Sequence, residues 1–226
     1  MTVDRSTTRW ALTRMPRRGR RLTQLVAGLV AYAVSMALMM RAGLGSMPWD
    51  VLHQGLALHT GLSIGATTVL VGAVALLLWI PLRERPGIGT VANVVVIGLT
   101  VDLALAAVPV VDVLWVRIAF AVTGIVLNGA ATAAYIGVGL GPGPRDGLMT
   151  GLAARTGRSV RLVRTTIEVA VVLTGWLLGG TFGVITVAYA LCVGPLIQWF
   201  LPRLAVACPP SPGAQPGQDG QHPAVP

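Results

Sequence analysis

The fold is decided by two stretches of sequence, GLGSMPWDVLHQGLALHTGLSIG at residues 43–65 and GLGPGPRDGLMTGLAARTGRSVR at residues 139–161. Aligned without a gap at a constant offset of 96 residues, they are identical at 12 of 23 positions. Shared apolar composition explains matched leucine and alanine, but it does not explain matched Pro, Asp, Thr and Ser in one register. The sequence therefore predicts that the chain contains an internal duplication.

The composition of the rest of the chain indicates a membrane protein. Of the 226 residues 54% are hydrophobic and only 11% are charged, whereas a soluble domain carries about a quarter charged residues. Six apolar runs have nearly the length that crosses a bilayer as a helix; they are residues 22–40, 62–82, 88–108, 118–138, 165–179 and 184–201. This pattern excludes a soluble enzyme, a fibrous protein and a disordered chain.

The number of spans predicts how the two copies are oriented. Three spans fall in each half, at residues 18–110 and 111–205, and because three is odd the second half must enter the membrane from the opposite face. Basic residues cluster before residue 22 and between residues 139 and 164, which are both expected in the cytoplasm. We therefore expect an all-α membrane protein with six transmembrane helices as two inverted three-helix repeats, placed in the bacterial plasma membrane with both termini cytoplasmic.

The two ends of the chain are expected to lie outside these repeats. Residues 1–17 form a basic cytoplasmic tail suited to anionic lipid headgroups, and residues 206–226 form a proline-rich tail that we expect to be disordered. A net charge of +9 suggests nucleic acid in a soluble protein, but no stacking aromatic residues accompany these arginines. We therefore expect the lipid bilayer, and not nucleic acid, as a partner.

Each copy of the motif predicts a short helix after the first span of its half. The structural residues of the motif are Gly43, Gly45 and Pro48 in the first copy and Gly139, Gly141 and Pro144 in the second. The glycines let the chain leave the span without steric cost, and proline suits the first turn of a new helix. Asp50 and Asp146 follow in that turn, and Gln54 and Thr150 lie one turn further on the same face.

Two interpretations of these short helices are open. In the first, the aspartates satisfy free backbone N–H groups and complement the positive end of a short helix at the membrane interface. In the second, both half-helices are re-entrant and direct polar groups from opposite faces into a shared central cavity, as in transporters built from broken helices.

The candidate binding residues are Asp50, Asp146, Asp102, Arg145, Gln54, Thr150 and Glu168. Asp102 and Glu168 are ionisable residues within spans and are therefore functional candidates. Structural alternatives are open: Arg145 can extend to cytoplasmic headgroups, Asp102 can hydrogen-bond to a neighbouring span, and Glu168 can pair with Arg164 four residues earlier.

Catalytic and metal-binding patterns are missing from the sequence. His53 and His59 are six residues apart, which does not place them on one helical face, and the two cysteines share no metal-ligand spacing. No HExxH or CxxC pattern occurs. We therefore expect neither an enzyme nor a bound metal or cofactor.

The two motif copies, together with Trp79-Ile-Pro-Leu-Arg83 and Arg85-Pro-Gly-Ile-Gly-Thr90, resemble the YczE/YitT-type family of bacterial integral membrane proteins. The resemblance covers roughly residues 22–203. It implies a multi-pass plasma-membrane protein without an established biochemical activity, and it carries over no site residues.

These observations favour a small secondary transporter or facilitator for an unidentified small molecule or ion, with its site between the inverted repeats. In this hypothesis Asp102 is a coupling or substrate-contact carboxylate, and Arg145 is a cytoplasmic gate or an anion contact. The alternative is a non-transporting membrane scaffold or regulatory protein that acts through its arginine-rich cytoplasmic segments; a passive channel with paired re-entrant half-helices is a third possibility. The sequence specifies no oligomeric state.

Overall fold

The computed structural model describes residues 18–206, and within this range the chain is helical with no strand. The helices are α2 (Arg18–Ala42), α3 (Pro48–Thr60), α4 (Ile64–Leu82), α5 (Ile88–Ala107), α6 (Leu114–Ile136), α7 (Pro144–Thr156), α8 (Val160–Leu177) and α9 (Val184–Leu204). The predicted basic tail, and the predicted proline-rich tail beyond residue 206, lie outside the described residues.

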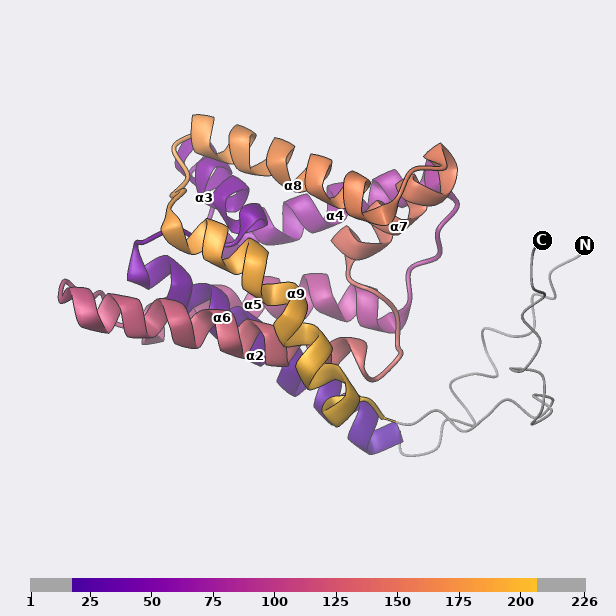
Figure 1. The fold of residues 1–226 in the computed structure, drawn as a ribbon, viewed down its shortest axis with the longest axis horizontal. Helices are drawn as coiled ribbons and strands as arrows, with labels where there is room; N and C mark the ends of the chain where they lie inside the picture. Colours follow the sequence, from indigo (N-terminus) through magenta and orange to yellow (C-terminus); the bar gives the residue numbers. More distant parts are fainter. Residues whose placement is uncertain (1–17, 207–226) are drawn as a thin grey trace, which may run out of the picture.

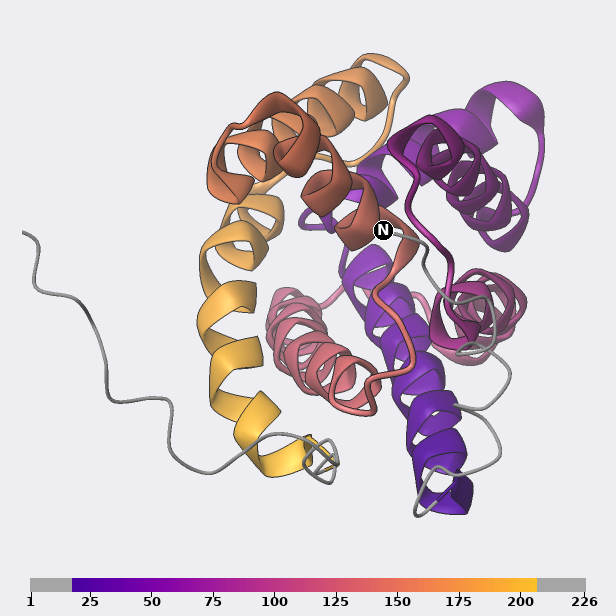
Figure 2. The same cartoon turned by 90° about the vertical axis from the view of Figure 1, so that its right-hand side faces the viewer.

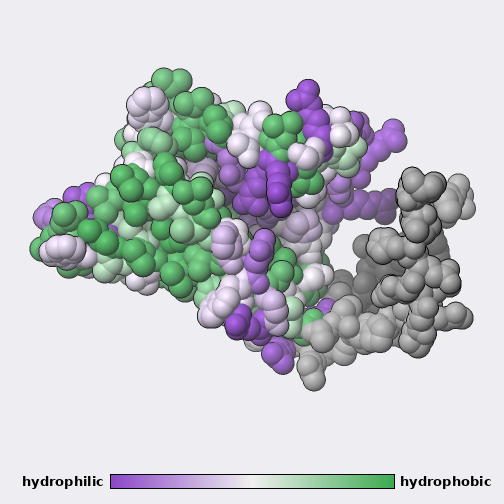
Figure 3. All heavy atoms as spheres, viewed as in Figure 1, coloured by the Kyte–Doolittle hydropathy of each residue, from purple (hydrophilic) through white to green (hydrophobic). Residues whose placement is uncertain are grey.

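Five of the described helices, α2, α4, α5, α6 and α9, are long and apolar enough to cross a membrane. Large apolar side chains face outward on them, with exposed fractions such as 68% for Leu99, 70% for Leu103 and 72% for Leu191. So much apolar surface is unfavourable in water and matches lipid. In Figure 3 hydrophobic residues cover the left part of the visible face, and most hydrophilic residues gather toward the right, near α7. The predicted all-helical membrane protein is confirmed.

The helix α2 belongs to a group of packed helices that also contains α5, α6 and α9. It runs between α5 and α6, and α9 packs on the far side of α6 (Figure 2). Glycines bring α2 and α6 close: a Cβ atom on Gly28 would lie 3.2 Å from the carbonyl oxygen of Ala131, and one on Gly124 would lie 2.7 Å from Met39 Cγ. Lipid supplies no hydrophobic driving force between helices, so their association depends on close van der Waals packing. Small residues at helix crossings allow that close packing.

The two short helices predicted from the motif are present, each 13 residues long with a proline in its first turn. Both chain reversals need glycine, because Gly45 has φ 118° and Gly141 has φ 121°, in a region that side chains disfavour. Both helices end at glycines in the left-handed conformation. The helix α3 lies in the upper left of Figure 1, and α7 lies toward the right.

Pairs of contacts recur with the two halves of the chain exchanged. The backbone N–H of Gly89 donates to the carbonyl oxygen of Leu140 at 2.9 Å, and the N–H of Ile185 donates to that of Leu44 at 3.1 Å. Ile185 lies 96 residues after Gly89, and Leu140 lies 96 residues after Leu44, which is the offset of the motif. At the level of whole helices, α3 packs on α8 while α7 packs on α4.

The crossing of α4 and α5 provides a test of the packing. A Cβ atom on Gly65 would lie only 2.1 Å from the carbonyl oxygen of Gly98, so alanine would force the two backbones apart. We expect Gly65→Ala to lower the free energy of unfolding by about 1–3 kcal/mol, measured by thermal unfolding in detergent. Gly194→Ala in α9 is the control, because nothing lies within 4 Å of its added Cβ. Equal losses in the two variants would contradict the close crossing.

Candidate functional site

A cavity of about 200 Å³ lies where the two short helices begin. Its wall includes Pro48 and Trp49 at the start of α3, and Pro144, Arg145 and Asp146 at the start of α7. The two copies of the duplicated motif, which are 96 residues apart in the chain, therefore contribute to one cavity.

Trp49 and Arg145 occupy the same place in the two copies, and they contact each other. The guanidinium carbon of Arg145 lies 4.9 Å from the centre of the Trp49 ring, which is a cation–π distance. Trp49, which precedes the aspartate of the first copy, thus packs directly on Arg145, which precedes the aspartate of the second copy.

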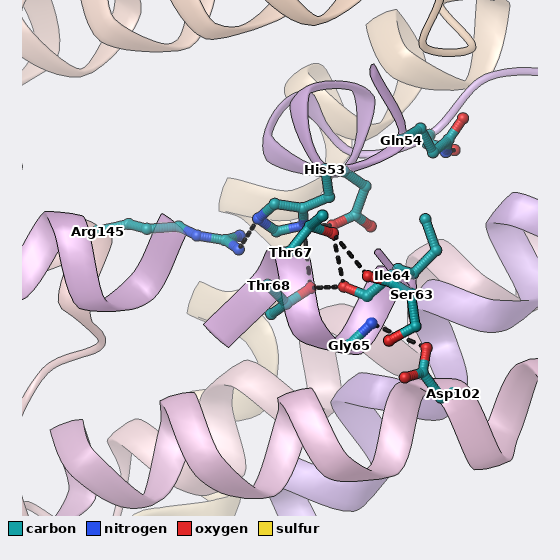
Figure 4. A network of polar contacts seen from close by, with 11 residues as sticks. His53, Gln54, Ser63, Ile64, Gly65, Thr67, Thr68, Asp102 and Arg145 are labelled. Atoms are coloured by element: carbon teal, nitrogen blue, oxygen red, sulfur yellow. Dashed lines mark hydrogen bonds and ion pairs between the residues drawn. The ribbon is translucent and has the colours of Figure 1, made fainter. Parts of the chain in front are cut away.

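Arg145 also links α7 to a buried pair on α3. Its Nη2 atom lies 3.1 Å from His53 Nε2, and Figure 4 shows the arginine extending from α7 to the edge of the imidazole ring. The other ring nitrogen, Nδ1, lies 3.3 Å from Asp50 Oδ1, and the side chains of Asp50 and His53 are both fully buried. A chain of polar contacts therefore joins a buried carboxylate on α3 to a cation on α7.

Asp50 does not cap its helix. Apart from the ion-pair contact with His53, neither carboxylate oxygen of Asp50 has a hydrogen-bond partner in the described part of the chain. The interpretation of this aspartate as an acceptor for free backbone N–H groups is therefore wrong. A buried carboxylate held this way is costly in stability unless a nearby cation offsets its charge, and Arg145 is the cation at the other end of the polar chain.

Asp146, the equivalent aspartate of the second copy, lines the cavity itself. Its Oδ2 atom accepts a hydrogen bond from the Tyr135 hydroxyl at 3.1 Å. The chain has three tyrosines, and all three line this cavity: Tyr32, Tyr135 and Tyr189. Sequence reasoning missed them, although their scarcity and their positions within apolar runs were available as a signal.

Glu168 and Asp102, the two carboxylates predicted to lie within spans, have different surroundings. Glu168 accepts a hydrogen bond from Arg164 Nε at 2.9 Å, as the spacing of four residues predicts, and both side chains line the cavity. Asp102 is not part of the cavity lining. Its Oδ1 accepts from the backbone N–H of Gly65 at 2.8 Å, so it binds the first turn of α4, a neighbouring span.

Gln54 and Thr150 also lie outside the cavity lining. Gln54 connects two loops, because its Nε2 donates to Ser46 Oγ at 2.7 Å and its Oε1 accepts from the N–H of Thr181 at 3.0 Å. The Thr150 hydroxyl donates to the carbonyl oxygen of Asp146 within its own helix. Of the seven candidates, Arg145, Asp146 and Glu168 meet at the cavity, and Asp50 reaches it through His53.

Metal binding finds no support in residues 18–206, where no three His, Cys, Asp or Glu side chains are grouped as ligands. The polar groups at the cavity include hydroxyl groups, the Asn93 amide, the Asp146 carboxylate, the Arg164–Glu168 ion pair and the Arg145 guanidinium. Such a wall can bind a small polar or charged molecule.

Comparison with known proteins places the chain in a family. The sequence profile of a family of unknown function (DUF6198) matches residues 19–202. The chain belongs to this family. No solved structure matches it.

The chain is similar to uncharacterised bacterial proteins, one of which is named as a membrane protein. An uncharacterized protein of Haemophilus influenzae is 38% identical over 199 residues, covering 88% of this chain and 91% of the relative. The uncharacterized membrane protein YczE of Bacillus subtilis is 33% identical over 186 residues, covering 81% and 86%. The predicted membership of a YczE-type family is confirmed, and so is the prediction that the chain is a membrane protein.

A double-mutant cycle tests whether Arg145 compensates the buried Asp50. Arg145→Gln leaves the Asp50 carboxylate without its cation, so we expect a clear loss of stability. Asp50→Asn combined with Arg145→Gln should lose less than the sum of the single changes, by about 1 kcal/mol, as measured by thermal unfolding in detergent. The exposed Arg161 provides the control: Arg161→Gln should combine additively with Asp50→Asn. Additivity in both cycles would contradict the coupling.

Proposed function

We propose that this family member is a small secondary transporter or facilitator, built as two inverted three-helix repeats, whose substrate site is the cavity where α3 and α7 meet. The role is non-enzymatic. The observation that carries the proposal is the contact between the equivalent residues Trp49 and Arg145 at that cavity.

Exchanged contacts support an inverted repeat. Equivalent residues touch each other when two copies are related by a two-fold rotation, because the interface is then self-complementary. A Cβ atom on Gly45 would lie 2.8 Å from Thr186 Oγ1, and one on Gly141 would lie 2.9 Å from Thr90 Oγ1, which is the same contact with the halves exchanged. A two-fold axis in the membrane plane inverts the second copy relative to the first.

The sixth span of the proposal is α8. Its 18 residues extend about 27 Å at the rise of an α-helix, close to the thickness of the hydrocarbon core. Its ionisable residues, Arg161, Arg164 and Glu168, lie in its first half, and the residues after Glu168 are uncharged. They would stand near the cytoplasmic surface and at the cavity, while the rest of the helix faces lipid.

Broken helices around a polar cavity favour transport over a structural role. In secondary transporters, discontinuous helices from equivalent positions of two repeats bring half-helix ends to a substrate site near the bilayer midplane. Here α3 and α7 have equal length, begin with equivalent residues and contribute their first turns to one cavity.

Labelling of one equivalent pair of positions tests the inversion. Thr60 and Thr156 end α3 and α7, are 96 residues apart and are both exposed. With Cys192 and Cys208 changed to serine, we expect a membrane-impermeant maleimide to label Thr60→Cys from outside intact cells. Thr156→Cys should be labelled only in inverted vesicles. Labelling of both from the same side would overturn the inverted repeat.

A ligand screen tests the site. We expect thermal-shift screening of the detergent-solubilised protein to yield compounds that raise its melting temperature and are taken up by proteoliposomes. Asp146→Asn should abolish both responses, because its carboxylate lines the cavity, while the melting temperature without ligand changes by only a few degrees. Asp112→Asn, in an exposed loop, is the control. If every stabilising compound acts equally on the wild type and Asp146→Asn, the cavity is not the site.

A further inference from the structure

The imidazole of His53 has a defined direction of hydrogen bonding. A guanidinium donates hydrogen bonds and accepts none, so at 3.1 Å from Arg145 Nη2 the Nε2 atom of His53 must be the acceptor. The proton of the neutral ring is then on Nδ1, which faces Asp50 Oδ1 and Thr68 Oγ1, each at 3.3 Å. The Thr68 hydroxyl already donates to the carbonyl oxygen of Ile64, which leaves its oxygen free to accept.

Neutral His53 therefore holds Arg145 in place. The three groups together carry no net charge, with Asp50 negative, the ring neutral and Arg145 positive. Arg145 is half-buried and lines the cavity, but one end of its guanidinium is engaged by the ring.

A second proton on the ring breaks this arrangement. It would bind the lone pair of Nε2, so that an N–H group and a positive charge would face the N–H groups and positive charge of Arg145. The hydrogen bond between them must then break, while the imidazolium remains paired with Asp50. The Nη2 group of Arg145 is then without its acceptor on the ring, and a guanidinium with free N–H groups binds carboxylates through paired hydrogen bonds.

We propose that His53 is a proton-binding site, and that a proton on its Nε2 releases Arg145 to bind a small carboxylate-bearing anion in the central cavity. Proton and anion then favour each other's binding, since linkage between two sites is reciprocal. The inference rests on the proposed transport function, and it assigns to it a substrate class and a coupling ion: the protein carries a small organic anion together with a proton.

The remaining charges around His53 fit this assignment. On its own helix the facing charged group is Asp50, on α7 it is Arg145, and α4 presents the uncharged Thr68. The helix α8, which packs against α3, carries Arg164 and Glu168, and these pair with each other. Asp146 is held by the Tyr135 hydroxyl. Arg145 is thus the cation at the cavity that loses its hydrogen-bond acceptor when His53 Nε2 takes up a proton.

Nuclear magnetic resonance of labelled histidine tests the proposal without a known substrate. In the full chain with His59→Gln and His222→Gln, His53 is the sole histidine. Long-range ¹H–¹⁵N spectra in lipid nanodiscs should show the Nδ1–H tautomer at high pH and the doubly protonated ring at low pH. Acetate at about ten times its dissociation constant should raise the titration midpoint by about one pH unit, and the neutral acetamide should leave it unchanged.

Variants locate the anion. Arg145→Gln should remove the effect of acetate, and Arg161→Gln should keep it. An Nε2–H tautomer at high pH, or an acetate effect no larger than that of acetamide, overturns the proposal. If Arg145→Gln fails to fold, the tautomer and the acetate shift of the parent chain still decide.

The outcome is separable from that of the proposed function. A ring that titrates and responds to acetate in a protein without measurable flux would leave a proton-linked anion site and refute transport. Flux of a screened compound through a protein whose His53 ignores acetate would support transport and refute the proton–anion coupling.

Discussion

A charge buried in a membrane protein must find its compensation within the protein, and in this chain the compensation comes from the other half of the sequence. Asp50 is fully buried on α3, and the cation that offsets it is Arg145 on α7, reached through His53. These polar contacts join α3 to α7. The contact of Trp49 with Arg145 joins the same two helices, and the first turns of both line the cavity.

Local patterns in the sequence were sufficient for the helices and their breaks. The glycines before Pro48 and Pro144 predicted chain reversals, and the structure gives Gly45 and Gly141 nearly the same left-handed backbone angle. Apolar length predicted membrane helices, and five described helices meet that criterion. The predicted run at residues 165–179 is the shortest of the six, and α8, which covers most of it, carries Arg161 and the Arg164–Glu168 pair and is not among those five helices.

The contacts of the site could not be predicted, since they join residues far apart in sequence. His53 and Arg145 are separated by 92 residues, and nothing in the sequence indicated a contact between them. Asp102 lies within an apolar run of the sequence, which makes a carboxylate a functional candidate. In the structure it binds the first turn of α4. Only the tertiary arrangement distinguishes a carboxylate that stabilises a helix end from one that faces a cavity.

The two copies of the motif have the same backbone conformation but different side chains next to their aspartates. This difference makes the two sides of the site chemically unequal. Asp50 has an imidazole as its partner, which is a group that can take up a proton. Met149 occupies the place of His53 in the second copy, and Asp146 instead accepts from the Tyr135 phenol, a group that ordinarily keeps its proton up to about pH 10. In the proposed mechanism the first copy responds to protons through this imidazole, and the second copy has no histidine at the equivalent place. A symmetric pair of histidines would place two responsive sites on one cavity. In the proposed mechanism the divergence of the copies restricts the response to the first half, whose His53 contacts Arg145 of the second half.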